Sequence, residues 1–265
     1  MGAMIYYLYK VKKYHNFFVV APSLTVYEKL VTDFTYGSKK YVFRGIGDFD
    51  ASNPKIVDGN NYSQINTDDS IQSLAFAEFE SEITINVFKI SKFVSRSESA
   101  TMRKLSEYLG KSYFDYLKSL KDLVVLMDES HRYRAESSSG AINELNPILG
   151  LEFTATPYFQ KGAKSSRFEN IAYEYNLASA IKDGFVKIPW VATRMNFDNS
   201  LPDEEKDFIK LRDAISIHDN TKIDLEIYAR NSGTQQVKPF ILVSAKTQTH
   251  AEEIEMLMKS DKFFE

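Results

Sequence analysis

Short runs of consecutive apolar residues alternate along the chain with segments of helical periodicity. Phe17–Val20 and Leu123–Met127 are continuous apolar runs, which is typical of strands buried on both faces of a parallel sheet. Residues 83–90 alternate apolar and polar side chains, and Gly150–Thr154 is a further short run. The pattern predicts an α/β fold: an open, mostly parallel sheet with helices on both faces and its working groups at the carboxyl ends of the strands.

Apolar residues spaced three and four positions apart predict the helices. These predicted helices cover residues 5–14, 24–34, 100–121, 177–183, 202–228 and 250–258. Two more strands are expected at 171–175 and 239–243. Residues 45–70 are rich in Gly, Asp, Asn and Ser, so they are expected to form a surface excursion with little core.

Composition narrows the class of protein. The 265 residues suffice for one large or two modest domains, and a net charge of −3 means that any nucleic acid must be held by a local patch. The absence of cysteine excludes disulfides and thiolate metal sites and fits a reducing interior. No apolar run approaches the roughly 18–20 residues that cross a bilayer, and no signal peptide opens the chain. We therefore expect a cytoplasmic protein without a membrane partner.

Two carboxylates and a histidine follow the strand predicted at Leu123–Met127. Asp128, Glu129 and His131 stand directly after its last apolar residue. In nucleotide hydrolysis the first carboxylate of such a pair can hold Mg²⁺, and the second can orient or deprotonate the attacking water. The alternative is that Asp128 and Glu129 only begin a loop and cap a helix.

Two hydroxyl side chains end the next predicted strand. Thr154 and Thr156 flank an alanine and precede Pro157. Such hydroxyls can donate hydrogen bonds to carboxylates or phosphates and so respond to what occupies a neighbouring site. The alternative is an ordinary junction between a strand and a turn. The position of this motif one strand after the carboxylates makes the pair more specific than either motif alone.

Together these motifs resemble those of the superfamily 2 helicases and translocases, in which motif II is Asp-Glu-x-His and motif III is commonly Thr-Ala-Thr. More narrowly, the chain resembles the helicase region of the Res subunit of type III restriction enzymes. The resemblance implies a RecA-like fold and an ATP-dependent DNA motor that uses ATP and Mg²⁺. It further implies that Asp128 holds Mg²⁺, Glu129 activates water, His131 links the site to motif III or to a second lobe, and Thr154 and Thr156 couple hydrolysis to movement on DNA.

The same resemblance identifies a DNA grip. Val19–Ser23 resembles motif Ia, and Ile85–Lys92 resembles the strand that follows it. Pro22, Ser23, Ser91 and Lys92 are thereby implied to hold the phosphate backbone without reading bases. Double-stranded DNA is the implied partner, together with a methyltransferase (Mod) subunit in the full assembly.

Basic residues are concentrated in the first 44 positions. This segment carries seven Lys or Arg, among them Lys12 and Lys13, against Glu28 and Asp33. Such a run is usually a solvated face of the protein, but its position beside motif Ia favours a contribution to DNA binding.

A phosphate-binding loop is missing from the sequence. A motor of this kind needs Gly-x-x-x-x-Gly-Lys-Ser/Thr, and Gly110-Lys111-Ser112 lacks the first glycine and follows a predicted helix. We therefore expect a piece of a longer enzyme that is inactive toward ATP by itself. The implied domains are a first RecA-like lobe without its P-loop at 1–195, a helical linker at 196–236 and the beginning of a second RecA-like lobe at 237–265.

Two alternatives stay open at this point. The chain could be a non-catalytic DNA-binding or scaffold piece, which a P-loop upstream in the parent gene would argue against. It could also belong to another superfamily 2 motor, such as a type I restriction motor or a repair helicase.

Overall fold

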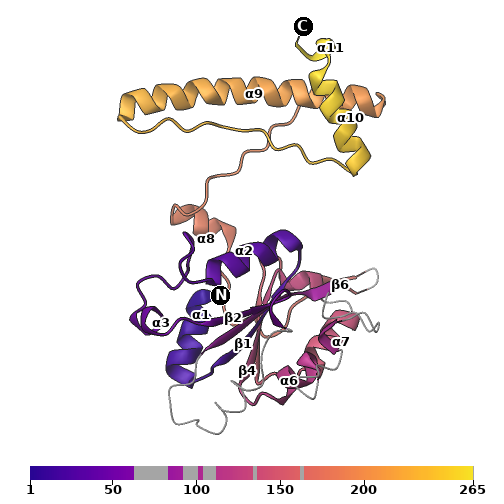
Figure 1. The fold of residues 1–265 in the computed structure, drawn as a ribbon. Coiled ribbons are helices and arrows are strands. Elements are labelled where there is room, and N and C mark those ends of the chain that lie inside the picture. The colour runs from indigo at the N-terminus through magenta and orange to yellow at the C-terminus, as the bar shows by residue number, and fades with distance from the viewer. Residues whose placement is uncertain (63–82, 92–100, 104–111, 134–135, 162–163, 265) are drawn as a thin grey trace. The chain divides into compact units, whose positions relative to one another are not determined.

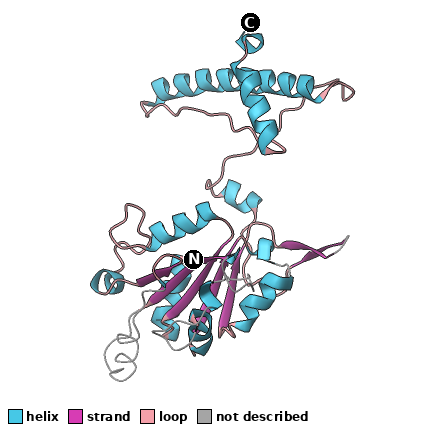
Figure 2. Cartoon of the chain, turned by 45° about the vertical axis from the view of Figure 1, so that its right-hand side comes forward, coloured by secondary structure: helices cyan, strands magenta, loops and turns pink. Residues whose placement is uncertain are grey.

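The computed structural model describes residues 1–62, 83–91, 101–103, 112–133, 136–161 and 164–264 (Figure 1). The chain divides into two compact units, Met1–Glu174 and Tyr175–Glu265. The first unit holds the sheet and the second holds helices (Figure 2). The domain boundaries predicted at residues 195 and 236 stay predictions.

A parallel sheet forms the centre of the first unit. Its strand order is β2-β3-β1-β4-β5, and every neighbouring pair is parallel. β1 lies in the middle, where Val20 stands opposite Phe88 on one side and Met127 on the other. This arrangement confirms the predicted RecA-like α/β fold. The strands are β1 (Asn16–Ala21), β2 (Lys55–Asp58), β3 (Thr84–Lys89), β4 (Leu123–Asp128) and β5 (Leu149–Phe153).

Alternate residues of β1 divide the core into two layers. Phe17 and Val19 pack in one cluster with α1 (Gly2–Tyr7), α2 (Leu24–Phe34) and α3 (Gly47–Ala51), whereas Phe18 and Val20 pack in another with α6 (Tyr113–Ser119) and α7 (Glu136–Glu144). Figure 1 shows these two groups of helices on opposite sides of the sheet. Each fully buried side chain of this size contributes roughly 1.5–3 kcal/mol. A strand apolar on both faces is therefore stable only between two helical layers.

The turn between β1 and α2 is fixed by its sequence. Pro22 cannot extend a sheet ladder because it has no backbone N–H, and Ser23 accepts a hydrogen bond from the backbone N–H of Val26 at 3.3 Å. The helix therefore begins at Leu24, directly above the carboxyl end of β1. Ahead of β1, the predicted helix at 5–14 is also present, as α1 continued by the π-helix η1 (Leu8–Lys12).

The segment expected to be a surface excursion contains part of the core. β2 pairs with β3 at the edge of the sheet, and Phe49 of α3 and Val57 of β2 are buried. The prediction for residues 45–62 was therefore wrong. The physical reason is length, because a four-residue strand with two apolar side chains leaves no readable pattern. Residues 63–70 lie outside the described part of the chain.

The single helix predicted at 100–121 was wrong in its extent, because Ser112 has an extended backbone and α6 starts only after it. Residues 101–103 form a 3-10 helix, η3 (Thr101–Arg103), and α6 begins after Ser112, whose hydroxyl caps it by accepting from the N–H of Asp115 at 3.1 Å. Residues 104–111, with most of the Gly-Lys-Ser string, lie outside the described residues.

The segment after β5 differs from the sequence prediction. After Pro157 the chain forms an antiparallel hairpin of β6 (Tyr158–Lys161) and β7 (Lys164–Arg167), which the hydrophobic pattern did not predict. Residues 171–175, expected as a strand, form no strand. A strand needs a neighbour for its backbone groups, and the described part of the first unit places none beside this segment.

The second unit confirms the predicted helices. It contains α8 (Leu177–Lys182), α9 (Asp203–Ser232), α10 (Gln248–Lys259) and α11 (Asp261–Phe264). The strand expected at 239–243 was wrong: this segment has no ladder partner among the described residues, and Phe240 and Leu242 are 84% and 85% exposed. Whether residues 237–265 begin a second lobe stays a prediction. Across the described part of the chain, no helix has both the length and the apolar character needed to cross a membrane.

A buried polar contact in the first unit joins α6 to β3. Asn86, in the middle of β3, is 1% exposed, and its side-chain amide donates to the backbone carbonyl of Phe17 at 3.0 Å. The hydroxyl of Tyr113 on α6 donates to the side-chain oxygen of Asn86. Burial raises the pKa of Tyr113 well above its ordinary value, so the hydroxyl stays a donor at neutral pH. The contact ties α6 to the central strands.

We predict that Tyr113→Phe lowers the free energy of unfolding by about 1–3 kcal/mol, because the buried oxygen of Asn86 loses its donor. Urea unfolding followed by circular dichroism measures the change. Tyr7→Phe is the control, since Tyr7 is half exposed and should change stability by less than about 0.5 kcal/mol. Equal stability of Tyr113→Phe and the unchanged protein would contradict the structural role of this contact.

Candidate functional site

The residues singled out from the sequence follow adjacent strands of the sheet. Because the strands are parallel, their carboxyl ends meet at one edge, in the order β3, β1, β4, β5. Ser91 follows β3 and is exposed, and Pro22 and Ser23 follow β1. The carboxylates and the histidine follow β4, and the two threonines follow β5. The proposed DNA-contact and hydrolytic groups are therefore neighbours along this edge. Lys92 lies outside the described residues.

The chain turns sharply at the end of β4. Asp128 is the last residue of the strand, stands opposite Phe153 of β5 and is partly buried. Glu129 has a positive φ of 51°, a conformation that non-glycine residues rarely adopt. A 3-10 helix, η4 (Ser130–Tyr133), begins with the next residue. The left-handed turn thus carries the second carboxylate out of the strand direction, with 42% of its side chain exposed.

His131 connects this loop to the end of β5. Its Nδ1 lies 2.9 Å from the Oγ1 of Thr154 and 3.2 Å from the Oγ1 of Thr156. The same nitrogen lies 3.4 Å from a carboxylate oxygen of Glu129. Thr154 also accepts from the backbone N–H of Thr156 at 3.1 Å, which folds the two hydroxyls toward the ring. The structure therefore brings together four of the five residues predicted as catalytic, with Glu129, Thr154 and Thr156 around one ring nitrogen of His131.

This nitrogen can satisfy only some of its three oxygen neighbours at once. When Nδ1 carries a proton it can donate to the carboxylate of Glu129 or to a threonine hydroxyl. When Nδ1 is unprotonated it can accept from Thr154 or Thr156, and the carboxylate then has no donor there. Nδ1 can therefore bond to Glu129 only when it carries the proton, whereas it can bond to Thr154 or Thr156 with or without it.

A tyrosine that the motif analysis did not single out closes the same loop. Tyr133, at the end of η4, is 2% exposed, and its hydroxyl donates to the backbone carbonyl of Val20 on β1 at 3.2 Å. Burial raises the pKa of Tyr133, and the nearby Asp128 carboxylate raises it further. Its only signal in the sequence is an aromatic residue two positions after the histidine, which cannot be distinguished from ordinary core.

The two carboxylates fit a divalent cation held together with a nucleotide. Mg²⁺ is usually bound by one or two carboxylates, with phosphates and water completing its shell. Asp128 and Glu129 supply two such groups at an open edge, and no cluster of three or more His, Asp or Glu ligands occurs in the described ranges.

Burial lowers the pKa of the Met1 α-amino group, while nearby Asp128 acts in the opposite direction. The start of the chain therefore lies within electrostatic reach of this carboxylate.

The basic residues of the first 44 positions do not form one surface at this edge. Lys10 pairs with Asp48 at 2.8 Å, and Lys29 pairs with Asp33 at 2.5 Å. Lys13 comes just before β1 begins, at the amino edge of the sheet, whereas Ser23 follows its carboxyl end. The positive charge counted along the sequence is thus partly neutralised and partly located at the opposite edge.

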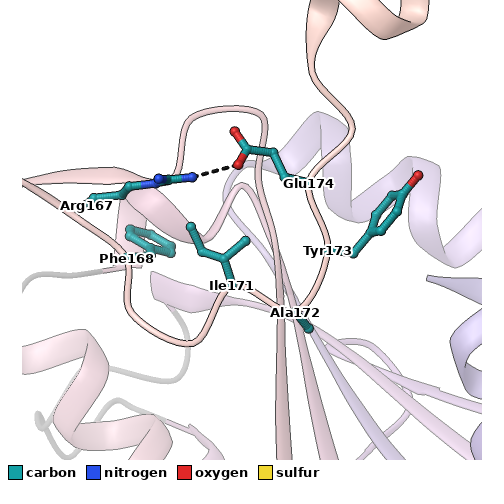
Figure 3. Close-up of a pocket in the computed structure, with 6 residues that line it drawn as sticks. All are labelled: Arg167, Phe168, Ile171, Ala172, Tyr173 and Glu174. Carbon is teal, nitrogen blue, oxygen red and sulfur yellow. Dashed lines mark hydrogen bonds and ion pairs between the residues drawn. The ribbon is translucent and has the colours of Figure 1, made fainter.

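A shallow hollow of about 400 Å³ lies elsewhere in the first unit. It is bordered by the end of β7 and the segment up to Glu174, and Figure 3 shows Arg167 and Glu174 joined across it by an ion pair of 2.6 Å. None of the residues predicted as site residues lines it. The candidate site is therefore the open edge of the sheet, where ligands bind in parallel α/β folds.

We predict that Glu129→Gly is more stable than Glu129→Ala by about 1 kcal/mol, because glycine adopts a positive φ without strain and alanine does not. Both variants remove the carboxylate, so their difference isolates the backbone conformation. Urea unfolding of the two variants measures it. An alanine variant as stable as the glycine variant would show that the left-handed turn costs nothing here.

Comparison with known proteins places this geometry in a family. Residues 1–159 match the family model of the type III restriction enzyme res subunit, and a search of curated proteins gives no match. The matched region contains the whole parallel sheet, the loop of Asp128 to His131 and the two threonines. Members of this family are helicase-like, ATP-dependent motors that use ATP and Mg²⁺. A chain with this match and this order of groups along the sheet edge belongs to the family of the type III restriction enzyme res subunit.

Proposed function

We propose that this chain is the part of a type III restriction endonuclease motor that carries its hydrolytic carboxylates and part of its DNA grip. The observation that supports the proposal is the cluster around His131, in which Glu129 of the β4 loop and Thr154 and Thr156 of the β5 end share one ring nitrogen. In a family of ATP-dependent motors, this arrangement would connect Glu129, which would activate the attacking water, to the two threonines, which would respond to hydrolysis.

The two carboxylates divide the work of hydrolysis by their positions. Asp128, fixed at the end of β4 and partly buried, would hold Mg²⁺. Glu129, more exposed and turned away from the strand, would orient the attacking water and accept its proton. Bound Mg²⁺ would supply charge stabilisation for the transferred phosphate.

His131 would then transmit the state of the site. Loss of the carboxylate as a partner leaves Nδ1 to the hydroxyls of Thr154 and Thr156, so a change at Glu129 shifts the hydrogen bonds at the end of β5. We assign the coupling of hydrolysis to DNA movement to these two threonines.

Contacts to DNA would come from the neighbouring strand ends. Ser23 donates no hydrogen bond through its capping role, so its O–H remains able to donate to a phosphate, and Pro22 and Ser91 stand beside it at the same edge. We assign the same role to Lys92, which follows Ser91 in the sequence. Double-stranded DNA is the proposed substrate, and a methyltransferase subunit is the proposed partner in the full assembly.

The sequence itself lacks the loop that would position ATP. No Gly-x-x-x-x-Gly-Lys-Ser/Thr string occurs in the 265 residues. We infer that hydrolysis requires a phosphate-binding loop from another part of the parent enzyme. The same absence supports the second candidate function, a DNA-binding piece without catalysis.

The DNA grip is tested with Ser23→Asp, which keeps a capping oxygen for Val26 but adds a negative charge. Thr247→Asp is the matched control, because Thr247 caps α10 in the second unit by the same kind of bond, accepting from the N–H of His250 at 3.1 Å. We expect the unchanged chain to bind double-stranded DNA weakly, without sequence preference and less as salt rises. Ser23→Asp should weaken binding roughly tenfold and Thr247→Asp by less than about twofold.

Fluorescence anisotropy at two ionic strengths measures these affinities. Equal effects of the two substitutions would show that only net charge matters and that Ser23 is not a phosphate contact. Tight binding that ignores salt would contradict backbone recognition altogether.

We predict that the 265-residue chain alone hydrolyses ATP at background rate, with or without DNA, because no positioned γ-phosphate faces the carboxylates. A coupled steady-state ATPase assay measures this. DNA-stimulated turnover of about 1 s⁻¹ or faster, abolished by Glu129→Gln, would overturn the prediction and show that the chain binds ATP by other means.

A further inference from the structure

One buried hydroxyl connects the two loops that the proposed function treats separately. The β4 loop carries the carboxylates, and the turn between β1 and α2 carries Ser23. Tyr133 belongs to the first loop, and its hydroxyl donates to the carbonyl of Val20, just before the second. The two residues are 113 positions apart in the sequence.

The first end of this connection is short and direct. η4 begins immediately after Glu129, and its turn is closed by the backbone N–H of Arg132, which donates to the carbonyl of Glu129 at 3.0 Å. Tyr133 follows in the same turn. A displacement of the carboxylate of Glu129 that moves its backbone therefore moves the tyrosine ring within one helical turn.

The other end lies next to the start of α2. Val20 is followed by Ala21 and Pro22, and Ser23 then caps the helix. The carbonyl of Val20 thus lies two residues before Pro22 and three before the capping Ser23. The hydroxyl of Tyr133 donates to this carbonyl.

No second side chain of η4 makes this connection. Ser130 is also buried, at 1% exposure, but its hydroxyl has no hydrogen-bond partner among the residues that the structure describes. His131 bonds toward β5, and Arg132 is exposed. Within the described residues, the link from η4 to β1 by a side-chain hydrogen bond depends on Tyr133.

We propose that Tyr133 is a positioning residue that links the carboxylate loop after β4 to the DNA-contact turn after β1 through its bond to the carbonyl of Val20. The link itself is argued from the geometry alone. Its proposed role is communication between hydrolysis and the DNA-contact turn, and that role rests on the proposed function. Tyr133 bonds to Val20 of β1, and His131 bonds to Thr154 at the end of β5. The carboxylate loop is therefore connected to the strands on both sides of β4.

Tyr133→Phe is the test, because it keeps the packed ring and removes only the hydroxyl. Tyr113→Phe is the matched control: it also removes a buried hydroxyl that donates one hydrogen bond, but to Asn86 within the sheet. Amide hydrogen exchange of the whole chain, followed by mass spectrometry, reports on residues 23–27 and 129–133 separately. Residues 84–89 of β3 provide the internal reference.

We expect Tyr133→Phe to speed exchange roughly threefold or more in both loop segments and to leave β3 unchanged. Tyr113→Phe should not favour the loop segments over β3. Faster exchange in residues 129–133 alone would overturn the link, because it would mean that the hydroxyl stabilises only its own turn. The same pattern in both variants would also overturn it, because a general loss of stability would then account for the change.

DNA affinity separates the link from its proposed use. If the turn after β1 grips phosphates, Tyr133→Phe should weaken binding roughly threefold while leaving the dependence of affinity on salt unchanged, because no phosphate contact is removed. Unchanged affinity together with faster exchange in both loops would overturn the communication role. If the chain without any substitution bound no DNA, the proposed function would be overturned. The exchange result would still show whether Tyr133 links the two loops.

Discussion

The parallel pairing of β1 with β3 on one side and β4 on the other determines where every candidate group stands. A strand in this position is buried on both faces, and its sequence, Phe17 to Ala21, has no polar side chain that could face water. Parallel pairing brings the carboxyl ends of its neighbours to one edge. Without this register, with Val20 opposite Met127, the carboxylates after β4 would not lie beside the turn that begins α2.

The β4 loop adopts an unfavourable backbone conformation at Glu129, the residue proposed to activate water. Glu129 holds a left-handed conformation that asparagine or glycine would adopt at lower cost, and the other non-glycine positions of this kind are Lys13 and three asparagines in the described ranges. Local strain persists where surrounding contacts hold it. Here His131 and Tyr133 supply such contacts, one to β5 and the other to β1.

Local pattern was sufficient for the long elements and insufficient for the short ones. Continuous apolar runs identified β1 and β4, and helical spacing identified α2, α9 and α10, because each of these elements repeats its signal several times. β2 has four residues and escaped notice. Residues 239–243 have the composition of a buried strand, yet they form none, because a strand exists only with a partner for its backbone.

The sequence by itself determined the α/β class, and it predicted Asp128, Glu129, His131, Thr154 and Thr156 as one site, because their order and spacing follow predicted strand ends. It could not decide which of them meet. Only the tertiary structure placed His131 against threonines 23 and 25 positions away, and Tyr133 against a carbonyl on the central strand. It also separated Lys13 from Ser23 to opposite ends of β1. Charges and motifs can be read directly from the sequence. Which residues make contact depends on the register and direction of the strands, which the sequence does not show.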